Sequence, residues 1–393
     1  MSQDRVVLLD GARTPVGSFG GALSAVPGFE LGATAAKVAL ERSDVDASDI
    51  GEVVMGCIGQ VGPDAYNARR VALAAGLPVT APAYTVNRLC GSGLQAIWSA
   101  AMQLRWGGVD IALAGGDESM SRMPFYDFGA RAGYKLGDRA LLDGTVMMLT
   151  DPFHDIHMGV TAENVAREYG VSRQEQDAFA LESQQRAASP AAKVAFGEEI
   201  TPVQVAGRRP VTVTEDEHPK PGTTLEALAK LRPAFKKDGT VTAGNASGIN
   251  DGAAAVVLTR ESVAAERGLT PLVALEAVAT AALEPELMGY APVPALRKLF
   301  EQTGLTPADV DVVELNEAFA AQAVAVIRDA GLDPDKTNPY GGAIALGHPV
   351  GATGAILTLR AAKHLARTDG ELGVVTMCIG GGQAMAALLR RVG

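Results

Sequence analysis

The chain has 393 residues, of which 47% are hydrophobic and 20% charged, and its formal net charge is -11. This length exceeds the usual size of one hydrophobic core, and the composition excludes a disordered chain, so we expect a well-packed enzyme of two or three domains. The negative charge argues against nucleic-acid binding, and no apolar run reaches membrane-spanning length, so we expect neither nucleic acid nor membrane as a partner. Three cysteines without CxxC spacing, and no visible leader, predict a reduced cytoplasmic protein without disulfides or a zinc cluster.

In chain order, a strand predicted at residues 6–9 opens an alternation of short β-branched runs with alanine-rich helical stretches. This alternation is typical of an α/β fold. It contains an internal repeat, because ASDIGEVVMG at 47–56 aligns with PADVDVVELN at 307–316. The shift between the two segments is 260 residues.

The same shift links further features of the chain. It brings Cys90 onto Val350, and both residues precede an apolar helix. Apolar strands end in glycines at 115–116 and at 380–382, but the strand that follows the first of these comes only about 130 residues later. We therefore predict a duplicated α/β unit whose first copy carries a large insertion near 119–248.

The predicted insertion differs in composition from the rest of the chain. Ser172 and Glu175 form a capping box that opens a helix through about residue 188, and the chain after this helix is rich in proline. The basic residues of this part are Arg208, Arg209, Lys220, Lys230, Arg232, Lys236 and Lys237. They form either a solvated surface or a seat for an anionic, phosphate-bearing ligand.

Cys90, in the run NRLCGSG at 87–93, is the first candidate for chemistry. A predicted strand before it and helical spacing after it place Cys90 beside the positive end of a helix dipole, which predicts a lowered thiol pKa and a nucleophile. Gly91 and Gly93 would let a substrate carbonyl approach backbone N–H groups that can bind an oxyanion. The alternative is a small buried hydrophobic side chain, and Ser92 is interpreted as a helix cap.

Two further candidates lie in glycine-rich turns. His348 stands between Gly347 and Pro349, ahead of a helix predicted at about 352–366, where an imidazole could take the proton of a thiol. Cys378 ends a predicted strand and enters three glycines, so its thiol would be accessible to a ligand. An ordinary loop histidine and a structural strand cysteine are the alternatives.

Asn316 ends a predicted strand and either caps the following helix or orients a water in an active site. The repeat predicts that Asn316, His348 and Cys378 share the carboxyl ends of the strands, where open α/β sheets place their sites. Cys57 lies in mid-strand and is predicted to be core. The pair His154 and His157 has weak metal-ligand spacing without a third ligand, so no metal site is expected.

The segments that hold these residues resemble the thiolase family. The resemblance covers essentially the whole chain in order, and it is greatest to the acetyl-CoA acetyltransferases. The matching runs are NRLCGSG at 87–93, NEAF at 316–319, GGAIALGHPVGATGA at 341–355, CIGGG at 378–382, DGARTPVGSFGG at 10–21, HMGVTAENVA at 157–166 and TAGNASGINDGAAA at 242–255.

The resemblance implies an α/β thiolase fold, which is a duplicated five-layer αβαβα arrangement with an inserted loop domain. It divides the chain into an N-terminal half (1–118 plus 249–268), a loop domain that binds coenzyme A (119–248) and a C-terminal half (269–393). It also implies a homo-oligomer, either a tight dimer or two dimers paired into a tetramer.

The family roles fall on the candidates above. Cys90 would be the acylated nucleophile, His348 the base that activates it, and Cys378 the thiol that removes or returns the α-proton of the second acyl-CoA. Asn316, through a water, and His348 would form one oxyanion hole, and the amides of Cys90 and Gly380 the other. The acyl-CoA contacts implied by the resemblance are Leu149, His157, Met158, Lys220, Phe235, Ala243, Ser247, Met288, Ala318 and Phe319.

The implied reaction is reversible acyl transfer, in which acetyl-CoA and an acyl-CoA give a 3-ketoacyl-CoA and coenzyme A through an acyl-cysteine. Acetoacetyl-CoA is the expected product. The coenzyme A thioesters would be substrates, and no cofactor is expected. The alternatives are a degradative thiolase for longer chains and a non-catalytic acyl-CoA binding protein on the same scaffold.

Three positions depart from the family pattern. Lys220 stands where arginine is common, and Ala227 where serine is common, which affects the expected coenzyme contacts at the rim. Tyr290 stands where a smaller residue is usual, next to Met288-Gly289, and we expect it to alter the acyl-chain preference.

Overall fold

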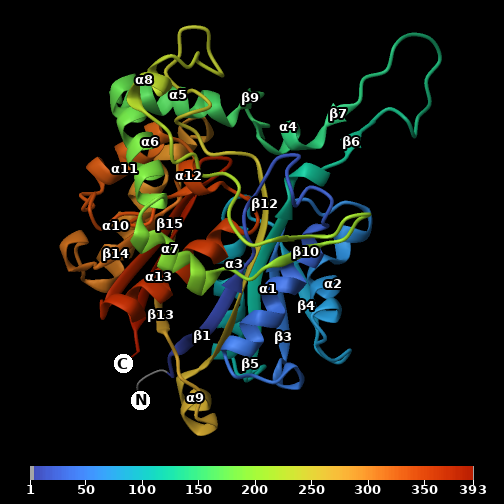
Figure 1. Cartoon of the computed structure of the whole chain (residues 1–393), viewed down its shortest axis with the longest axis vertical. Helices are drawn as coiled ribbons and strands as arrows, with labels where there is room; N and C mark the ends of the chain where they lie inside the picture. The colour runs from blue at the N-terminus through green and yellow to red at the C-terminus, as the bar shows by residue number, and fades with distance from the viewer. Residues whose placement is uncertain (1–3, 393) are drawn as a thin grey trace.

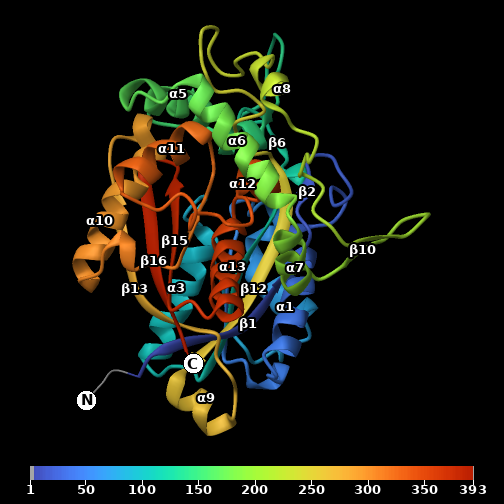
Figure 2. The ribbon, with the colours of Figure 1, turned by 60° about the vertical axis from the view of Figure 1, so that its left-hand side comes forward.

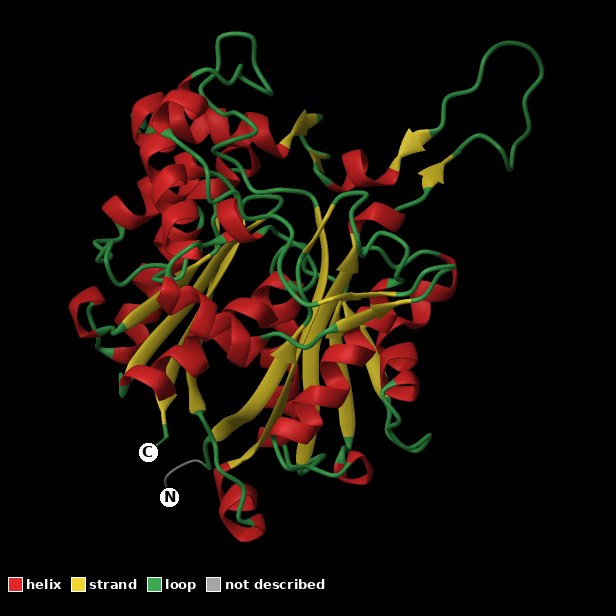
Figure 3. Cartoon of the chain, viewed as in Figure 1, coloured by secondary structure: helices red, strands yellow, loops and turns green. Residues whose placement is uncertain are grey.

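The computed structural model describes residues 4–392, and their backbone is organised around a mixed sheet with two halves. The strands of the first half are β1 (Val6–Arg13), β2 (Gly17–Ser18), β3 (Glu52–Gly56), β4 (Ala83–Val86), β5 (Ile111–Ser119) and β12 (Asn250–Arg260). Those of the second half are β13 (Val273–Ala282), β14 (Val312–Leu315), β15 (Leu372–Ile379) and β16 (Gln383–Arg391). Figure 3 shows them as two groups of strands with helices between and around them.

The two halves repeat one topology. In the first, β3 runs parallel to β5, and β5, β12 and β1 follow as antiparallel neighbours. In the second, β14 runs parallel to β15, and β15, β16 and β13 follow in the same way. The predicted duplication is therefore confirmed. The halves join where β1 pairs with β13, through Val7 with Ala274 and Leu8 with Val273, so the hydrogen-bonded sheet is continuous.

The helices complete five layers, as the thiolase resemblance implies. Those of the first half are α1 (Gly28–Arg42), α2 (Asn67–Ala74), α3 (Ser92–Arg105) and α9 (Glu261–Arg267), and those of the second are α10 (Pro292–Thr303), α11 (Ala320–Asp329), α12 (Ala343–Leu346) and α13 (Thr353–Thr368). One core, between the two sheet halves, contains α3 and α13, whereas α1 and α2 cover the outside of the first half and α10 and α11 the outside of the second. The layers can be followed in Figure 1.

The two inner helices approach each other closely at their N-terminal ends, because the second residue of each is a glycine. A Cβ on Gly93 of α3 would lie 2.7 Å from the backbone nitrogen of Ala355, and a Cβ on Gly354 of α13 would lie 2.3 Å from that of Leu94. Side chains at either position would push the helices apart. The glycines of the two sequence motifs therefore hold the segments that carry Cys90 and His348 against each other.

The segment between β5 and β12 forms a separate set of short elements. Its strands are β6 (Phe125–Tyr126), β7 (Leu142–Asp143), β8 (Thr150–Asp151), β9 (Ile156–His157), β10 (Val203–Val205) and β11 (Val211–Val213). Its helices are α4 (Gly144–Met148), α5 (Met158–Glu168), α6 (Arg173–Ala187), α7 (Pro190–Glu199) and α8 (Leu225–Ala229). The capping box predicted at Ser172 is present, and α5 and α6 pack on α11 at the top of the second half (Figure 1).

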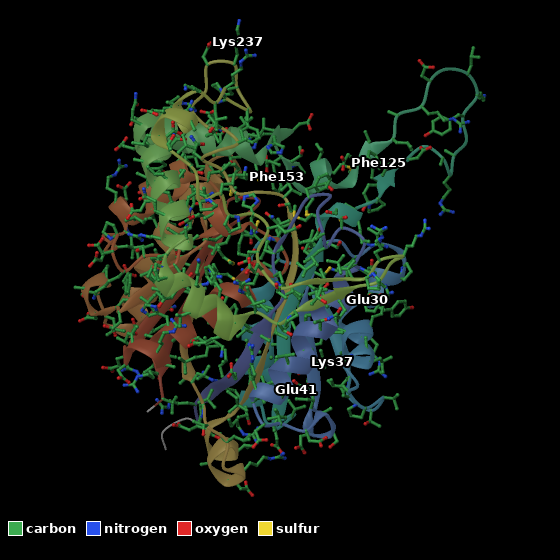
Figure 4. The ribbon with its side chains drawn as sticks, viewed as in Figure 1. Glu30, Lys37, Glu41, Phe125, Phe153 and Lys237 are labelled. Atoms are coloured by element: carbon green, nitrogen blue, oxygen red, sulfur yellow. The ribbon has the colours of Figure 1, made fainter. Side chains whose placement is uncertain are left out.

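The basic residues of this segment do not form one surface. Arg208 and Arg209 lie in the turn of the β10–β11 hairpin, which projects from the side of the molecule in Figure 2. Lys237 lies at the tip of a different loop, at the top of Figure 4, and the ammonium of its neighbour Lys236 donates to Asn164 Oδ1 at 3.1 Å. Within residues 4–392, none of the helices has the length and apolar character required to cross a membrane.

Candidate active site

Cys90 lies in the turn between β4 and α3, as predicted, and this turn is strained. Leu89, directly before Cys90, has a φ of 49°, in the left-handed region that non-glycine residues seldom adopt. Ser92 holds the turn: its hydroxyl accepts the backbone N–H of Arg88 at 2.9 Å and donates to the carbonyl of Leu89 at 2.6 Å. The interpretation of Ser92 as a helix cap is wrong, because Gly91 is the N-cap and Ser92 bonds backward into the turn.

The environment of the Cys90 thiol differs from the one that the helix dipole predicts. Burial raises the pKa of Cys90 to about 11, although the backbone N–H groups of Gly380 and of Cys90 itself stabilise the thiolate. The prediction of a lowered pKa is therefore wrong, since desolvation outweighs the dipole. The thiol is neutral at rest and needs a base at the moment of attack.

His348 lines the same cavity as Cys90 and is neutral, so its imidazole is able to accept a proton. It lies in the segment between α12 and α13, with 5% of its surface exposed, and burial lowers its pKa to about 4, so the imidazole is neutral. Its backbone N–H donates to Asn250 Oδ1 at 2.9 Å, and its Nδ1 lies 2.6 Å from Thr353 Oγ1. On the other side of the ring, Nε2 lies 3.4 Å from Asn316 Nδ2.

Asn316 follows the last residue of β14 and is completely buried. It does not cap a helix, because α11 begins four residues later with Phe319 as its N-cap, so the capping alternative is wrong. Its Oδ1 has no hydrogen-bond partner among residues 4–392. A buried amide oxygen of this kind is normally satisfied by a water or a ligand.

Cys378 is the penultimate residue of β15, beside the glycine turn at 380–382, in which Gly381 and Gly382 have φ values of 79° and 78°. Burial, with a smaller contribution from the nearby Cys90, raises the pKa of Cys378 above its usual range. Its thiol packs with Met288, Ala318 and Phe319. The two strand ends thus bring Asn316 and Cys378 together as the repeat predicted, whereas His348 comes from a loop and not from a strand end.

A cavity of about 360 Å³ unites most of the predicted residues. Its wall includes Cys90, His348 and Gly380, together with Leu149, His157, Met158, Phe235, Ala243, Ser247, Met288, Ala318 and Phe319. Cys378 and Asn316 lie behind this wall, against Phe319 and His348 respectively. Phe153, which is exposed near the upper centre of Figure 4, lies beside Gly381 at the glycine turn.

One side of the cavity is an aromatic stack. His157 stacks on Phe235 with ring centroids 4.8 Å apart, and Phe235 meets Phe319 edge to face at 6.2 Å. The stack requires Gly159, because a Cβ there would lie 2.3 Å from the Phe235 ring. The Nδ1 of His157 accepts the N–H of Gly159 at 3.0 Å, so its position is tied to the start of α5. An apolar, rigid wall of this kind suits an extended apolar ligand.

Lys220 lies outside this cavity. It lines a second cavity of about 250 Å³ with Ala227 and His218, and Ala243 borders both cavities. Two of the three positions that depart from the family pattern therefore share one small cavity beside the main one. The third, Tyr290, lines neither: its ring stacks on Tyr169 with centroids 3.7 Å apart, and its hydroxyl donates to Asp329 at 3.0 Å. Tyr290 therefore does not border the acyl end of the main cavity, and its expected influence on acyl-chain preference would have to be indirect.

The structure also locates the remaining cysteine, Cys57, and the two histidines with weak metal-ligand spacing. Cys57 is buried, with its thiol 3.7 Å from Glu118, as expected of a core residue. His154 and His157 do not converge, since His154 contacts Asp151 at 2.9 Å and His157 stacks in the cavity wall. Within the described part of the chain, no three His, Cys, Asp or Glu side chains group as a metal-ligand set.

Some residues of the site were not identified from the sequence. The cavity wall also contains Ile58, Leu89, Met120, Met148, Ala234, Ala246, Gly248, Ile249 and Val350. Of these, Leu89, Ala246, Gly248, Ile249 and Val350 lie within the matched motifs without an assigned role, and the repeat also aligns Val350 with Cys90. Thr353 and Asn250, which hold His348, lie within the matched motifs but had no role assigned to them.

The family of the chain follows from its sequence as a whole. Residues 6–262 match the model of the thiolase N-terminal domain, and residues 269–391 match that of the thiolase C-terminal domain. The chain therefore belongs to the thiolase family, and it is an acyltransferase with the thiolase fold.

Individual relatives extend over the full length of the chain. It is 51% identical to the beta-ketothiolase BktB of Cupriavidus necator and 48% identical to an acetyl-CoA acetyltransferase of Chromobacterium violaceum, over 98% of this chain and 99% of each relative. Among solved structures, it is similar to the Bacillus anthracis acetyl-CoA acetyltransferase, with a TM-score of 0.97, 41% identity and 99% coverage of both chains. A human mitochondrial 3-ketoacyl-CoA thiolase in complex with CoA matches with a TM-score of 0.96 and 42% identity, over 99% of this chain and 98% of that one.

Proposed function

We propose that this enzyme catalyses reversible acyl transfer between two acyl-CoA molecules, with acetyl-CoA as donor and acetoacetyl-CoA as the principal product. The observation that carries the proposal is that one thiol and one neutral imidazole line an apolar cavity, with a second thiol directly behind its wall. A thiol nucleophile suits the chemistry because it keeps the acyl group activated as a thioester.

In the first half-reaction, Cys90 Sγ attacks the acetyl carbonyl as its proton passes to His348 Nε2. The backbone N–H groups of Cys90 and Gly380, which point at the Cys90 sulfur, would bind the oxyanion. The tetrahedral intermediate collapses to acetyl-Cys90, and the departing CoA thiolate takes the proton of Cys378. This step leaves an imidazolium and a Cys378 thiolate.

In the second half-reaction, the Cys378 thiolate removes the α-proton of a second acetyl-CoA. The resulting enolate is stabilised by His348 Nε2–H and by a water held on the free Oδ1 of Asn316. Its carbon attacks acetyl-Cys90, the Cys90 thiolate leaves, and it regains its proton from His348. The protons and bonds balance over the cycle, and two half-reactions at one site imply ping-pong kinetics.

Coenzyme A would enter along the stack of His157 and Phe235, with Leu149, Ala243 and Ser247 beside its pantetheine arm. Its distal end would reach the smaller cavity at Lys220. Met288 and Phe319, both almost fully buried, would surround a short acyl group. Because the chain supplies nucleophile, base and acid, we propose that the reaction needs no further cofactor.

The organisation and setting of the enzyme are proposals from the same family relationship. We propose that the segment at 119–248 serves as the loop domain that binds coenzyme A, between the halves at 1–118 plus 249–268 and at 269–393. We also propose a homo-oligomer, either a dimer or a tetramer, and a cytoplasmic location. Light scattering after size-exclusion chromatography would establish the oligomeric state, and cell fractionation the location.

The test of the proposed function is acetylation of Cys90. Incubation with acetyl-CoA should add one acetyl group to the peptide that contains Cys90, and Cys90→Ala should abolish both the adduct and turnover. Turnover should fall on the order of 10⁶-fold, the scale found when a nucleophile is removed. An unmodified Cys90 peptide in the wild-type enzyme would favour the non-catalytic acyl-CoA binding protein. Initial rates with 3-ketoacyl-CoA thioesters of increasing length would then separate acetoacetyl-CoA from longer-chain substrates.

A further inference from the structure

Thr353, the first residue of α13, contacts both the His348 ring and the backbone of the next residue, Pro349. Its Oγ1 lies 2.6 Å from His348 Nδ1 and donates to the carbonyl of Pro349, one turn back, at 2.9 Å. Thr353 is 3% exposed and does not line the main cavity, so it is placed to contact the imidazole and not a substrate.

The hydrogens of this group can be ordered by counting donors and acceptors. The single hydroxyl proton of Thr353 goes to the Pro349 carbonyl, so its oxygen accepts a proton from His348 Nδ1. A neutral imidazole carries one N–H, and Nε2 is therefore the lone-pair nitrogen. Asn316 Nδ2 faces that lone pair at 3.4 Å as a donor.

The other tautomer fits the same geometry poorly. With the proton on Nε2, the ring N–H would face the Asn316 N–H₂ group, so two donors would oppose each other. The Thr353 hydroxyl would have to turn from Pro349 to Nδ1. The first arrangement gives the Nδ1–H and the Thr353 hydroxyl an acceptor each, whereas the second leaves the buried Nε2–H without one, which costs about 1–3 kcal/mol.

We propose that Thr353 is a positioning residue, which fixes Nε2 as the basic nitrogen of His348 and stabilises the imidazolium formed during each half-reaction. This inference rests on the proposed role of His348 as the base. On this inference the Thr353 hydroxyl acts on His348, in addition to any contribution that it makes to the stability of α13.

The test compares three substitutions in the same helix. Thr353→Val keeps the shape of the side chain and removes the hydroxyl, whereas Thr353→Ser keeps the hydroxyl. Thr358→Val is the matched control: Thr358 is also fully buried and donates to a carbonyl one turn back, that of Gly354 at 2.7 Å. If the hydroxyl served only to stabilise the helix, the two valine variants would behave alike.

For Thr353→Val we expect kcat and the rate of Cys90 acetylation to fall about 10- to 100-fold, by analogy with the loss of the outer hydrogen-bond partner of a metal-bound histidine. KM should change little, Thr353→Ser should restore most of the rate, and Thr358→Val should retain it. Equal losses in the two valine variants, or no recovery with serine, would overturn the proposal.

A spectroscopic measurement tests the tautomer without activity. In enzyme labelled with ¹⁵N-histidine, His348 should show a protonated Nδ1 and an unprotonated Nε2, assigned by the loss of its signals in His348→Asn. Thr353→Val should mix the two forms. A protonated Nε2 in the wild-type enzyme would overturn the inference even if turnover is normal. Failure of Cys90 to become acetylated would instead overturn the proposed function, and the ¹⁵N spectrum would still decide the tautomer of His348.

Discussion

The ends of β5 and β15 occupy equivalent places in the two halves but carry opposite chemistry. Asp117 pairs with Ala253 at the end of β5, and Cys378 pairs with Ala384 at the corresponding point of β15. The first position is a carboxyl group and the second a thiol. Both are buried, but the thiol lies just behind the cavity wall, near Cys90, whereas the carboxyl group accepts from Asn67.

The carboxylates of β5 serve as supports. Glu118, next to Asp117, accepts the backbone N–H groups of Ile58, Gly59 and Gly351 at 2.8–3.0 Å. Ile58 and the neighbour of Gly351 both line the cavity. One copy of the repeat thus secures the loops around the site, while the other places a thiol in it. The duplication thus gives two similar strand ends: the carboxyl groups at the end of β5 support neighbouring loops, and the thiol at the end of β15 is available for chemistry.

Among the substitutions that test these different roles of the two strand ends, Cys378→Ala should have the largest effect. We expect condensation and thiolysis to fall by about 10²- to 10⁴-fold, because a general acid and base is lost, while Cys90 still becomes acetylated. Steady-state kinetics and peptide mass spectrometry measure the two outcomes. Cys57→Ala is the control, since Cys57 is also buried but its thiol contacts Glu118 and not the residues behind the cavity wall, and its turnover should stay within about twofold. Unchanged turnover in Cys378→Ala would remove the second thiol from the mechanism.

The next test concerns Asp117. Burial raises the pKa of its carboxyl group to about 8. Because this value lies above that of an unfolded chain, about 4, the folded state holds the extra proton between the two. Asp117 therefore contributes stability that is present at low pH and is lost as the pH rises through about 8, by up to about 1.4 kcal/mol per pH unit.

Asp117→Asn copies the neutral form and removes that proton from the linkage. We expect the loss of stability between about pH 5 and pH 8 to become shallower, as measured by thermal unfolding midpoints across this range. The Asn67 amide, which donates to Asp117 Oδ2 at 2.9 Å, keeps an acceptor in the variant. An identical pH dependence in both proteins would contradict the assignment of Asp117 as a buried, largely protonated group.

A smaller effect is expected at the other point where the halves differ. The repeat aligns Ser92, which holds the strained turn at Leu89, with Ala352, which has no hydroxyl. Ser92→Ala should relax this turn, and we expect the rate of Cys90 acetylation to fall about tenfold, equivalent to about 1.4 kcal/mol. Ser99→Ala, a change in the same helix whose hydroxyl contacts Gln95, should leave this rate unchanged. Equal rates in both variants would show that the turn keeps its geometry without Ser92.

The duplicated framework could be predicted from the sequence because the repeat is local in each copy. In both, a short 3₁₀ helix (Ala47–Asp49 or Pro307–Asp309) leads directly into a strand. The capping box at Ser172 was identified for the same reason, since its partners lie within one turn. Such signals need only neighbouring residues.

The predictions that were wrong concern properties that depend on segments distant in the sequence. The helix dipole near Cys90 is local, but the desolvation that raises its pKa comes from chain brought over it, including Ile379, whose side chain packs against Gly91. Asn316 was considered as a cap because helical pattern follows it, yet packing delays α11 until Ala320. No local pattern indicates which nitrogen of His348 faces the cavity.

Tyr290 shows how adjacency in the sequence can mislead, and it gives the smallest effect. It is two residues from Met288, but the 3₁₀ helix at Pro285–Tyr290 turns the two side chains to different sides, one into the cavity and one onto Tyr169. Tyr290→Phe removes only the hydrogen bond to Asp329, so stability should change by less than about 1 kcal/mol.

The ratio of kcat/KM for 3-ketohexanoyl-CoA and acetoacetyl-CoA should therefore be the same in Tyr290→Phe as in the wild type. Met288→Ala, which enlarges the acyl end of the cavity, should shift this ratio toward the longer substrate by about tenfold, the scale expected for one or two methylene groups in an apolar pocket. A shift in Tyr290→Phe comparable with that in Met288→Ala would mean that the stack on Tyr169 transmits to the acyl end. It would then place chain-length selection in the helices around the C-terminal half, and not in the cavity wall alone.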